Sequence, residues 1–374
     1  MAFSRREAAV ALEVSSLLVP RPSGVGVYGR SLIRGLRSLM SDRRVDLVFC
    51  VSRYSKRRHH PAPGLKLKPY VNGRLLHRHY RLLHTLDTRL PPRFQGKIVA
   101  TVHDVLSVLP LAREKDLSTA RFRERKRSQY REIAARADAI VTVSEETRRQ
   151  FCSSFDAQGP VEVVYPGVDP GFTPESANEG RLKDLGLRRG RYILSVGELC
   201  ARKNLGAVVE AFLAIRRAAA GRGGEATRGL QLVLVGHPSF GWEESYVRRV
   251  IEEHRDCIHL LGFLSDQDLA CVYAGAAAFV HLSHYEGFGL PILEAMAAGI
   301  PVVAARRGGI PEAAGDAALL VDPDQPAEAQ RALREVLETP ELARAKRAAG
   351  LARAAGFTWS ACAERIAELY ERVL

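Results

Sequence analysis

The chain alternates short apolar segments with longer amphipathic ones along most of its 374 residues. Short runs rich in Val, Ile and Leu predict strands, and the segments between them predict helices. Regular alternation of this kind favours parallel sheets with crossover helices, which is the α/β class. Strands are expected near residues 8–18, 45–51, 97–102, 139–143 and 161–164, and a second series near 192–196, 230–235, 258–261, 277–282, 301–304 and 318–321.

Helical patterns fill most of the intervals between these strands. They are expected near residues 27–40, 121–137, 145–151, 328–355 and 359–373. Ser144 is a good N-cap for the third of them. Residues 52–96 are basic and irregular, with only a short helical pattern near 75–86.

The length exceeds what one hydrophobic core usually supports, so we expect two domains. A Pro- and Gly-containing stretch at 166–190 separates the two series of strands. We therefore expect an N-terminal domain at 1–165, a connection at 166–190 and a C-terminal domain at 191–355. The last segment, 356–374, is predicted to be a separate terminal helix.

The positive charge is confined to the N-terminal half. Residues 1–180 hold 31 Lys and Arg against 18 Asp and Glu, whereas residues 181–374 hold 24 of each. The excess is densest in residues 51–97, where twelve cations accompany the single acid Asp87. Such a segment attracts phosphates of a lipid surface, a lipid-linked acceptor or nucleic acid, unless its charge serves only solubility.

Neither metal binding nor a membrane span is expected. The six cysteines are scattered without a C-x-x-C pair, which favours reduced, mostly buried thiols. No apolar run approaches the length of a membrane span, and the N-terminus lacks the pattern of a signal peptide. We therefore expect a cytoplasmic protein, with peripheral association at the inner face of the plasma membrane through residues 53–97.

Residues 286–299, EGFGLPILEAMAAG, carry the clearest functional pattern. Pro291 suits the first turn of a helix and Gly299 its end, so the glycines before Pro291 form a loop at a helix N-terminus. Backbone N–H groups there bind phosphate. Glu286 precedes this loop and Glu294 follows it, and carboxylates bind hydroxyl groups. A phosphate between two hydroxyl-bearing groups predicts a sugar nucleotide as ligand.

A second pattern follows the strand expected at 192–196. Gly197 at its end lets the backbone approach a ligand closely, and Arg202 and Lys203 place two positive charges at one spot. Cleavage of a sugar nucleotide releases a diphosphate, whose growing negative charge preorganised cations stabilise.

Residues 286–299 resemble, nearly position for position, the donor-site signature of the retaining glycosyltransferases of family 4. The Arg202–Lys203 turn, the Ser144 segment and the turn at 165–169 follow in that family's order. The resemblance implies the GT-B architecture, two Rossmann-like domains facing across a cleft, with the N-terminal domain on the acceptor side. The resemblance further implies that the final helix, 356–374, crosses back to the N-terminal domain. It also implies transfer of a hexose from a nucleoside diphosphate sugar to a glycan or lipid-linked acceptor with retention, and the overall look suggests mannose from GDP-mannose in cell-envelope polysaccharide assembly.

The same resemblance implies roles for individual residues. Arg202 and Lys203 would hold the donor diphosphate, Glu286 the hydroxyls of the transferred sugar, Glu294 the ribose, and His103 would contact the donor sugar. Further donor-binding positions are Gly24, Gly26, Gly197, Gly262, Phe263, Leu264, Gly287, Phe288, Gly289 and Leu290. The resemblance also implies that neither a metal nor a cofactor is needed besides the donor substrate, because Arg202, Lys203 and helix dipoles would neutralise the leaving group.

Residues 24–29 leave a second interpretation open. They spell G-x-G-x-x-G after a strand, the pattern of a dinucleotide site. However, a dinucleotide site has an acidic residue at the end of the second strand, where this chain has Ser52 and Arg53. The resemblance instead implies that these glycines form a loop near the donor. An NADP-dependent oxidoreductase and a sugar-nucleotide epimerase of the same architecture remain alternatives, as does a nucleic-acid-binding protein, although none explains Arg202, Lys203 and both glutamates together.

Overall fold

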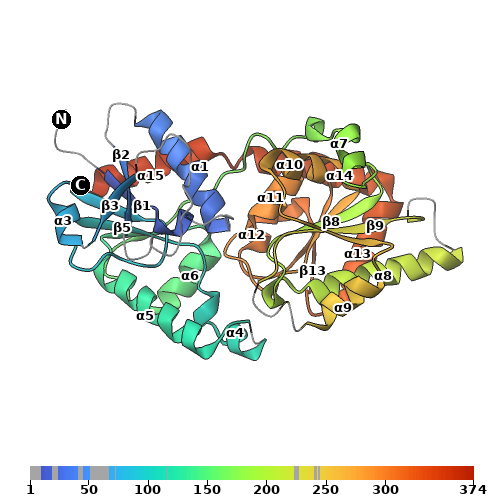
Figure 1. Ribbon diagram of the computed structural model, residues 1–374, viewed down its shortest axis with the longest axis horizontal. Coiled ribbons are helices and arrows are strands. Elements are labelled where there is room, and N and C mark those ends of the chain that lie inside the picture. The colour runs from blue at the N-terminus through green and yellow to red at the C-terminus, as the bar shows by residue number, and fades with distance from the viewer. Residues whose placement is uncertain are drawn as a thin grey trace. The chain divides into compact units, whose positions relative to one another are not determined.

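The computed structural model describes residues 10–18, 24–40, 45–50, 67–71, 73–115, 117–222, 227–239, 242 and 245–374. The chain forms two compact units. The N-terminal unit comprises Met1–Pro110, Thr119–Gly167 and Thr358–Leu374, and the C-terminal unit comprises Leu111–Ser118 and Val168–Phe357 (Figure 1). Each unit is built on its own parallel sheet, so the predicted α/β class is confirmed.

The N-terminal unit has a seven-stranded sheet in the order β3-β2-β1-β4-β5-β6-β7, and each adjacent pair is parallel. Its elements are β1 (Val10–Glu13), η1 (Ser15–Leu17), α1 (Gly24–Leu39), β2 (Val45–Cys50), β3 (Leu67–Tyr70), α3 (Gly73–His77), β4 (Leu82–Thr85), β5 (Lys97–Val102), η2 (Leu106–Val108), α5 (Ala120–Arg136), β6 (Ala139–Thr142), α6 (Glu145–Ser154), β7 (Val161–Val163) and α15 (Trp359–Val373).

Helices cover both faces of this sheet. Tyr130 and Ile133 of α5 and Phe151 of α6 pack against Leu83 and Ile98 of the sheet on one face. On the other face α1 lies beside the final helix α15 (Figure 1). Tyr370 of α15 is within 2.6 Å of His84 of β4, oxygen to ring nitrogen, so the last helix of the chain belongs to the N-terminal unit.

The C-terminal unit has a six-stranded parallel sheet in the order β10-β9-β8-β11-β12-β13. Its elements are most of α4 (Pro110–Glu114), η3 (Pro174–Ser176), α7 (Glu179–Asp184), β8 (Tyr192–Val196), η4 (Ala201–Lys203), α8 (Leu205–Arg222), β9 (Gln231–Val235), α9 (Tyr246–Glu253), β10 (Ile258–Gly262), α10 (Asp266–Gly275), β11 (Ala278–His281), α11 (Leu290–Ala297), β12 (Val302–Ala305), α12 (Ile310–Ala314), η5 (Gly315–Ala317), β13 (Leu319–Val321), α13 (Pro326–Glu338) and α14 (Pro340–Ala355). Phe212 of α8 and Leu333 of α13 join the strands in the main core cluster.

The structure corrects several expected elements. The helical pattern at 75–86 is wrong in its second half, because Leu82–Thr85 is β4, a fully buried strand between β1 and β5. A short apolar run buried on both faces has no period that separates strand from helix. β3 lies within the stretch expected to be irregular. The expected helix at 328–355 is two helices, because Pro340 cannot donate the hydrogen bond that would continue α13.

Candidate active site

The predicted phosphate-binding turns meet at the centre of the C-terminal sheet. Strand order reverses between β8 and β11, and parallel sheets bind ligands beyond the carboxyl ends of strands at such a reversal. β8 leads through Gly197 to the Arg202–Lys203 turn, and β11 leads from His281 to Glu286. Two segments more than 80 residues apart are therefore neighbours because their strands pair directly.

Glu286 joins the two segments through its carboxylate. Arg202 Nη1 donates to Glu286 Oε2 at 2.7 Å, and Lys203 Nζ donates to Glu286 Oε1 at 2.6 Å. His281 Nε2 lies 3.2 Å from the same Oε1. Arg202 also donates to the backbone carbonyl of Tyr285 at 3.0 Å, which fixes its guanidinium against the loop. The site thus brings together two cations and one carboxylate, with a formal charge of +1.

This charge balance controls the protonation of the cluster. Burial would raise the pKa of Glu286, but the charges of Arg202 and Lys203, aided by His281, hold that pKa well below its usual range. Burial, then the charge of Lys203, lowers the pKa of His281. At neutral pH the carboxylate is therefore ionised and the imidazole neutral.

Gly197 makes room for the lysine. Its φ of +147° is a conformation that side chains rarely adopt, and a Cβ there would lie 2.8 Å from Lys203 Cε. Lys203 is only 8% exposed, so its alkyl chain has little space to move aside. The strand-end glycine expected to allow close approach of a ligand also admits the lysine itself.

The glycine-rich turn before α11 is held from behind by a second pair of glycines. The Gly309 N–H donates to the Glu286 carbonyl at 2.8 Å. Gly308, at φ +57°, passes so close that a Cβ would lie 2.5 Å from the same carbonyl oxygen. The sequence did not predict this contact, although a Gly-Gly pair after an apolar strand is typical of a close backbone approach. Pro291 lies in the first turn of α11, as predicted.

Glu294 lies on α11 in a different environment from Glu286. It accepts a hydrogen bond from the Tyr273 hydroxyl at 2.9 Å. Burial raises the pKa of Glu294 to about 7, and the charges of Asp266 and Asp169 act in the same direction. Tyr273 was not identified from the sequence because a tyrosine in an apolar helix usually belongs to the core. The two glutamates thus differ in protonation near neutral pH.

The turn after β10 presents an exposed aromatic ring. Gly262 adopts φ +67°, and Phe263 is 50% exposed. The ring of Phe263 stacks on His237, with centroids 5.7 Å apart and planes 9° apart. His237, which follows β9, is a neighbour that the sequence did not indicate. Leu264 follows in the same turn, so the three donor-binding positions expected at 262–264 lie together on one turn with an exposed aromatic ring.

His103 belongs to the N-terminal unit, where it follows β5. Its Nε2 lies 3.1 Å from the Leu86 carbonyl oxygen, which assigns the proton to Nε2. Tyr28 of α1 packs edge-on against the imidazole, with centroids 4.7 Å apart. Burial lowers the pKa of His103, so the ring is neutral at pH 7 and presents Nδ1 as an acceptor.

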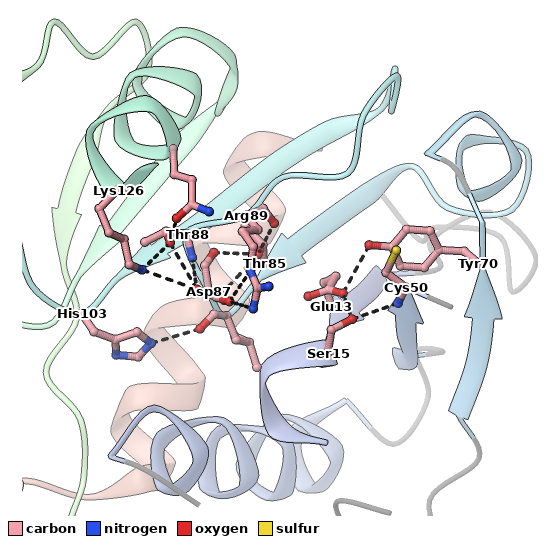
Figure 2. A network of polar contacts seen from close by, with 12 residues as sticks. Glu13, Ser15, Cys50, Tyr70, Thr85, Asp87, Thr88, Arg89, His103 and Lys126 are labelled. Carbon is pink, nitrogen blue, oxygen red and sulfur yellow. Dashed lines mark hydrogen bonds and ion pairs between the residues drawn. The ribbon is translucent and has the colours of Figure 1, made fainter. Parts of the chain in front are cut away.

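Figure 2 shows that His103 ends a row of polar side chains along the carboxyl edge of the N-terminal sheet. Asp87 accepts two bonds from Arg89, at 2.9 and 2.6 Å, and lies 4.0 Å from Lys126. Lys126 donates to Thr88 at 2.7 Å. Burial opposes ionisation of Asp87, but Arg89 and Lys126 lower its pKa to about 2. From the sequence, Asp87 and Arg89 were only part of the charge count of residues 51–97, and their partly buried ion pair was not predicted.

Part of the basic segment is neutralised locally. Lys68 pairs with Asp46 at 2.7 Å, Arg89 with Asp87, and Lys97 with Asp138 at 2.8 Å. Residues 51–66, which include Arg53, lie outside the described part of the chain.

The predicted glycine-rich loop at 24–29 is wrong as a loop. Gly24 and Gly26 lie in the first turn of α1, which begins three residues earlier than expected. Gly29 packs on Leu17, where a Cβ would lie 2.7 Å from a leucine methyl carbon. At least one of these glycines thus serves helix packing, a role that the motif does not distinguish from ligand binding.

The predicted site residues therefore fall into two groups. Arg202, Lys203, Glu286 and the turn at 287–290 form one cluster, and His103 with Gly24 and Gly26 belong to the other unit. Within the described ranges, no three His, Cys, Asp or Glu side chains are grouped to hold a metal ion. Among the helices that the structure describes, none combines the length and apolar character needed to cross a bilayer.

Comparison with known proteins identifies the family. Residues 182–353 match the family model for glycosyl transferases group 1, and residues 68–172 match the model for glycosyltransferase family 4. O-antigen chain mannosyltransferase B of Escherichia coli is 30% identical over 296 residues, 78% of this chain and 74% of that protein. The chain belongs to glycosyltransferase family 4. The resemblance seen in residues 286–299 is thereby confirmed.

Solved structures agree with the fold of this glycosyltransferase. Sucrose-phosphate synthase from Thermosynechococcus elongatus superposes with a TM-score of 0.75 at 22% identity, over 98% of this chain and 99% of that one. HepE from Anabaena, solved with UDP-glucose, superposes with a TM-score of 0.72 at 18% identity, over 97% of this chain and 99% of that one. The predicted GT-B architecture is confirmed. None of these matches supports an epimerase or an NADP-dependent oxidoreductase.

Proposed function

We propose that this glycosyltransferase moves a hexose, in the first instance mannose from GDP-mannose, to a glycan or lipid-linked acceptor with retention of configuration. The donor would be a nucleoside diphosphate sugar bound by the C-terminal unit. The transfer would proceed without a metal ion, since Arg202, Lys203 and the N-terminus of α11 supply the positive charge that the leaving diphosphate needs.

The observation that carries the proposal is the joint contact of Arg202 and Lys203 with Glu286. A buried cluster with one surplus positive charge suits a dianion better than a neutral ligand. The carboxylate of Glu286 is fixed within this cluster, beside the turn expected to bind phosphate. It is therefore suited to accept hydrogen bonds from hydroxyls on the sugar attached to that phosphate.

In the proposed reaction, the bond between the anomeric carbon and the β-phosphate oxygen breaks while the acceptor hydroxyl attacks from the same face. The departing phosphate oxygen takes the acceptor's proton, and Arg202 and Lys203 stabilise the diphosphate product. Glu286 positions the sugar and needs no covalent role. Glu294, in its ionised form, would accept hydrogen bonds from the ribose hydroxyls.

The relatives support a nucleotide sugar and favour mannose. The matched Escherichia coli protein bears the name O-antigen chain mannosyltransferase, and the Anabaena protein was solved with UDP-glucose. We accordingly propose a growing cell-envelope polysaccharide as the acceptor.

A donor panel tests the proposal. The purified protein is incubated with an α-linked mannotetraose as acceptor and with GDP-mannose, UDP-glucose or UDP-N-acetylglucosamine as donor, with and without a chelator, and nucleoside diphosphate release is measured. We expect GDP-mannose to be consumed fastest, the chelator to have no effect, and proton NMR of the product to show an α-linkage. A β-linked product would refute retention, and release from none of the donors would refute the activity.

A further inference from the structure

A groove runs along α8 in the C-terminal unit, beside the turn that carries Arg202 and Lys203. Its larger part has a volume of about 420 Å³ and a smaller part of about 220 Å³ continues along the helix. Both parts are lined by Gly206, Glu210, Tyr246 and Val247. Because they share this wall, they form one elongated depression, which suits a linear ligand.

The groove is contiguous with the site already described. Cys200, Ala201 and Asn204 line its larger part and flank Arg202 and Lys203 in the same turn. His284, which also lines it, donates its backbone N–H to the Arg202 carbonyl at 2.9 Å. A molecule bound here would therefore contact the two loops that hold the cluster around Glu286.

The charged groups of the groove cancel. Lys115 and Arg217 contribute two positive charges, and Glu210 and Asp324 two negative ones. Lys115 Nζ lies 2.8 Å from Asp324 Oδ1, so this pair offers donors and acceptors side by side. A phosphate, an acidic peptide or a nucleic acid would bring a net charge that this lining does not match. A neutral ligand with many hydroxyl groups matches it.

Two aromatic residues give the groove its apolar surface. Tyr246 is 57% exposed and lies where the two parts join, and Trp242 is buried in the wall of the larger part. The Tyr246 hydroxyl approaches α8 so closely that a Cβ on Gly206 would lie 2.9 Å from it. An exposed aromatic ring between polar groups can stack on the C–H face of a sugar while its neighbours bind the hydroxyls.

His284 contributes a mostly buried imidazole to the wall of the groove. Its Nδ1 has no hydrogen-bond partner among the described residues and lies 3.6 Å from Asp324 Oδ1. Burial lowers the pKa of His284, and the charge of Lys115 lowers it too, so the ring is neutral at pH 7. The neutral imidazole therefore adds no charge to the lining of the groove.

We propose that this groove binds an oligosaccharide of α-linked hexoses, as an extended subsite for the glycan that the enzyme lengthens. The proposal rests on the proposed function for the identity of the sugar, and on the lining of the groove for its chemical class. Tyr246 would stack on a central residue of the chain, with Glu210 and Lys115 binding hydroxyls on either side.

The test is direct binding of an α-linked mannotetraose to the full-length protein, by calorimetry and saturation-transfer NMR, in the presence of saturating GDP. We expect binding that GDP does not abolish. Tyr246→Ala should weaken it by about tenfold or more, because an aromatic contact and its buried area are lost. Tyr246→Phe, which keeps the ring, should bind like the wild type. Phe122→Ala, which removes an exposed ring on α5, is the matched control.

The outcomes separate this proposal from the proposed function. Equal affinity of Tyr246→Ala and the wild type, no detectable binding, or displacement by GDP would each overturn the groove assignment. Binding that depends on Tyr246 in a protein that turns over no donor would uphold the groove and refute the activity. Because Tyr246 is largely exposed, we expect Tyr246→Ala to fold, and its melting temperature verifies this.

Discussion

Glu286 explains how a carboxylate can lie beside an anion site. Its negative charge is outnumbered by Arg202 and Lys203, so the cluster keeps the net positive charge that the proposed diphosphate site requires. Arg202 and Lys203 are in turn held in place by the carboxylate, which reduces the entropy they would lose on binding a ligand. One residue thus orders both cations before the donor arrives.

Removing either cation should slow transfer. We expect Arg202→Ala and Lys203→Ala each to lower kcat by about 100-fold or more, because each deletes a charge-assisted contact to the leaving group. Arg202→Lys should recover only part of the rate, since an ammonium cannot reproduce the bidentate geometry of a guanidinium. Steady-state kinetics with the verified donor measures this, and wild-type kcat in both alanine variants would refute the phosphate assignment.

Calorimetry of nucleoside diphosphate binding should distinguish the roles of Glu286 and Glu294. Glu294→Ala is expected to weaken binding of the free nucleoside diphosphate, because it removes the proposed ribose acceptor. Glu286→Ala should leave that affinity near the wild-type value, because the loss of a competing anion offsets the loss of the group that orders both cations, but it should nearly abolish sugar transfer. Equal losses of nucleotide affinity in the two variants would contradict the assigned roles.

Glu294 should also impose a pH dependence. With a pKa of about 7 in the folded protein against an ordinary 4.5, the folded state keeps a proton that the unfolded chain releases. The contribution of Glu294 to the free energy of unfolding therefore falls as pH rises from about 4.5 to 7, and is constant above that.

Denaturant titrations at several pH values measure the free energy of unfolding of the wild type and of Glu294→Gln. The wild-type value minus the variant value should fall between about pH 5 and 7, the range set by the two pKa values. Nucleotide affinity of the wild type should rise over the same range as the carboxylate ionises. A difference that stays constant with pH would show that burial does not raise this pKa.

At the scale of elements, the turn after β8 depends on one glycine. Gly197→Ala would strain a backbone at φ +147° and press a methyl group against Lys203. We expect this variant to lose diphosphate affinity by about tenfold, because Lys203 must leave its position. Gly190→Ala is the matched control, since its φ is also positive, at +69°, but a Cβ there meets nothing within 4 Å.

The control distinguishes backbone strain from displacement of the lysine. Both variants should unfold at lower denaturant concentration, but only Gly197→Ala should bind the nucleotide more weakly. The same loss of affinity in Gly190→Ala would point to a general loosening of the C-terminal unit.

At the scale of the whole molecule, the asymmetric charge predicts docking of the N-terminal half on anionic lipid. Each Lys or Arg near such a surface contributes about 1 kcal/mol. We expect co-sedimentation with phosphatidylglycerol liposomes at low salt, release at high salt, and weaker binding when Arg53, Lys56, Arg57 and Arg58 are changed to Ser. The ion pairs of Lys68, Arg89 and Lys97 make those three poorer candidates.

Liposomes without anionic lipid are the control for this experiment. Binding that is indifferent to lipid charge, salt and the four substitutions would refute membrane docking. Tight binding to duplex DNA with a steep salt dependence would instead favour a nucleic-acid partner.

Local signals sufficed where a residue's role depends on its chain neighbours. Pro291 at the start of α11, Ser144 as an N-cap and the apolar runs of most strands were predicted because caps, turns and periodicity act over a few residues. The α/β class followed from their alternation, and the pattern of residues 286–299 indicated the family. The prediction of a helix at 75–86 was wrong in its second half, because a fully buried strand such as β4 has no local hydrophobic period.

Tertiary structure decided what depends on the pairing of distant strands. The adjacency of β8 and β11 brings Glu286 to Arg202 and Lys203, and no pattern within either segment specifies that ion pair. The support of Glu286 by Gly308 and Gly309, and the raised pKa of Glu294, likewise arise from burial and from charges far along the chain. The sequence by itself determined which groups the proposed donor site contains, whereas strand order determined how they are charged and held, because electrostatic energies depend on distance and burial in space.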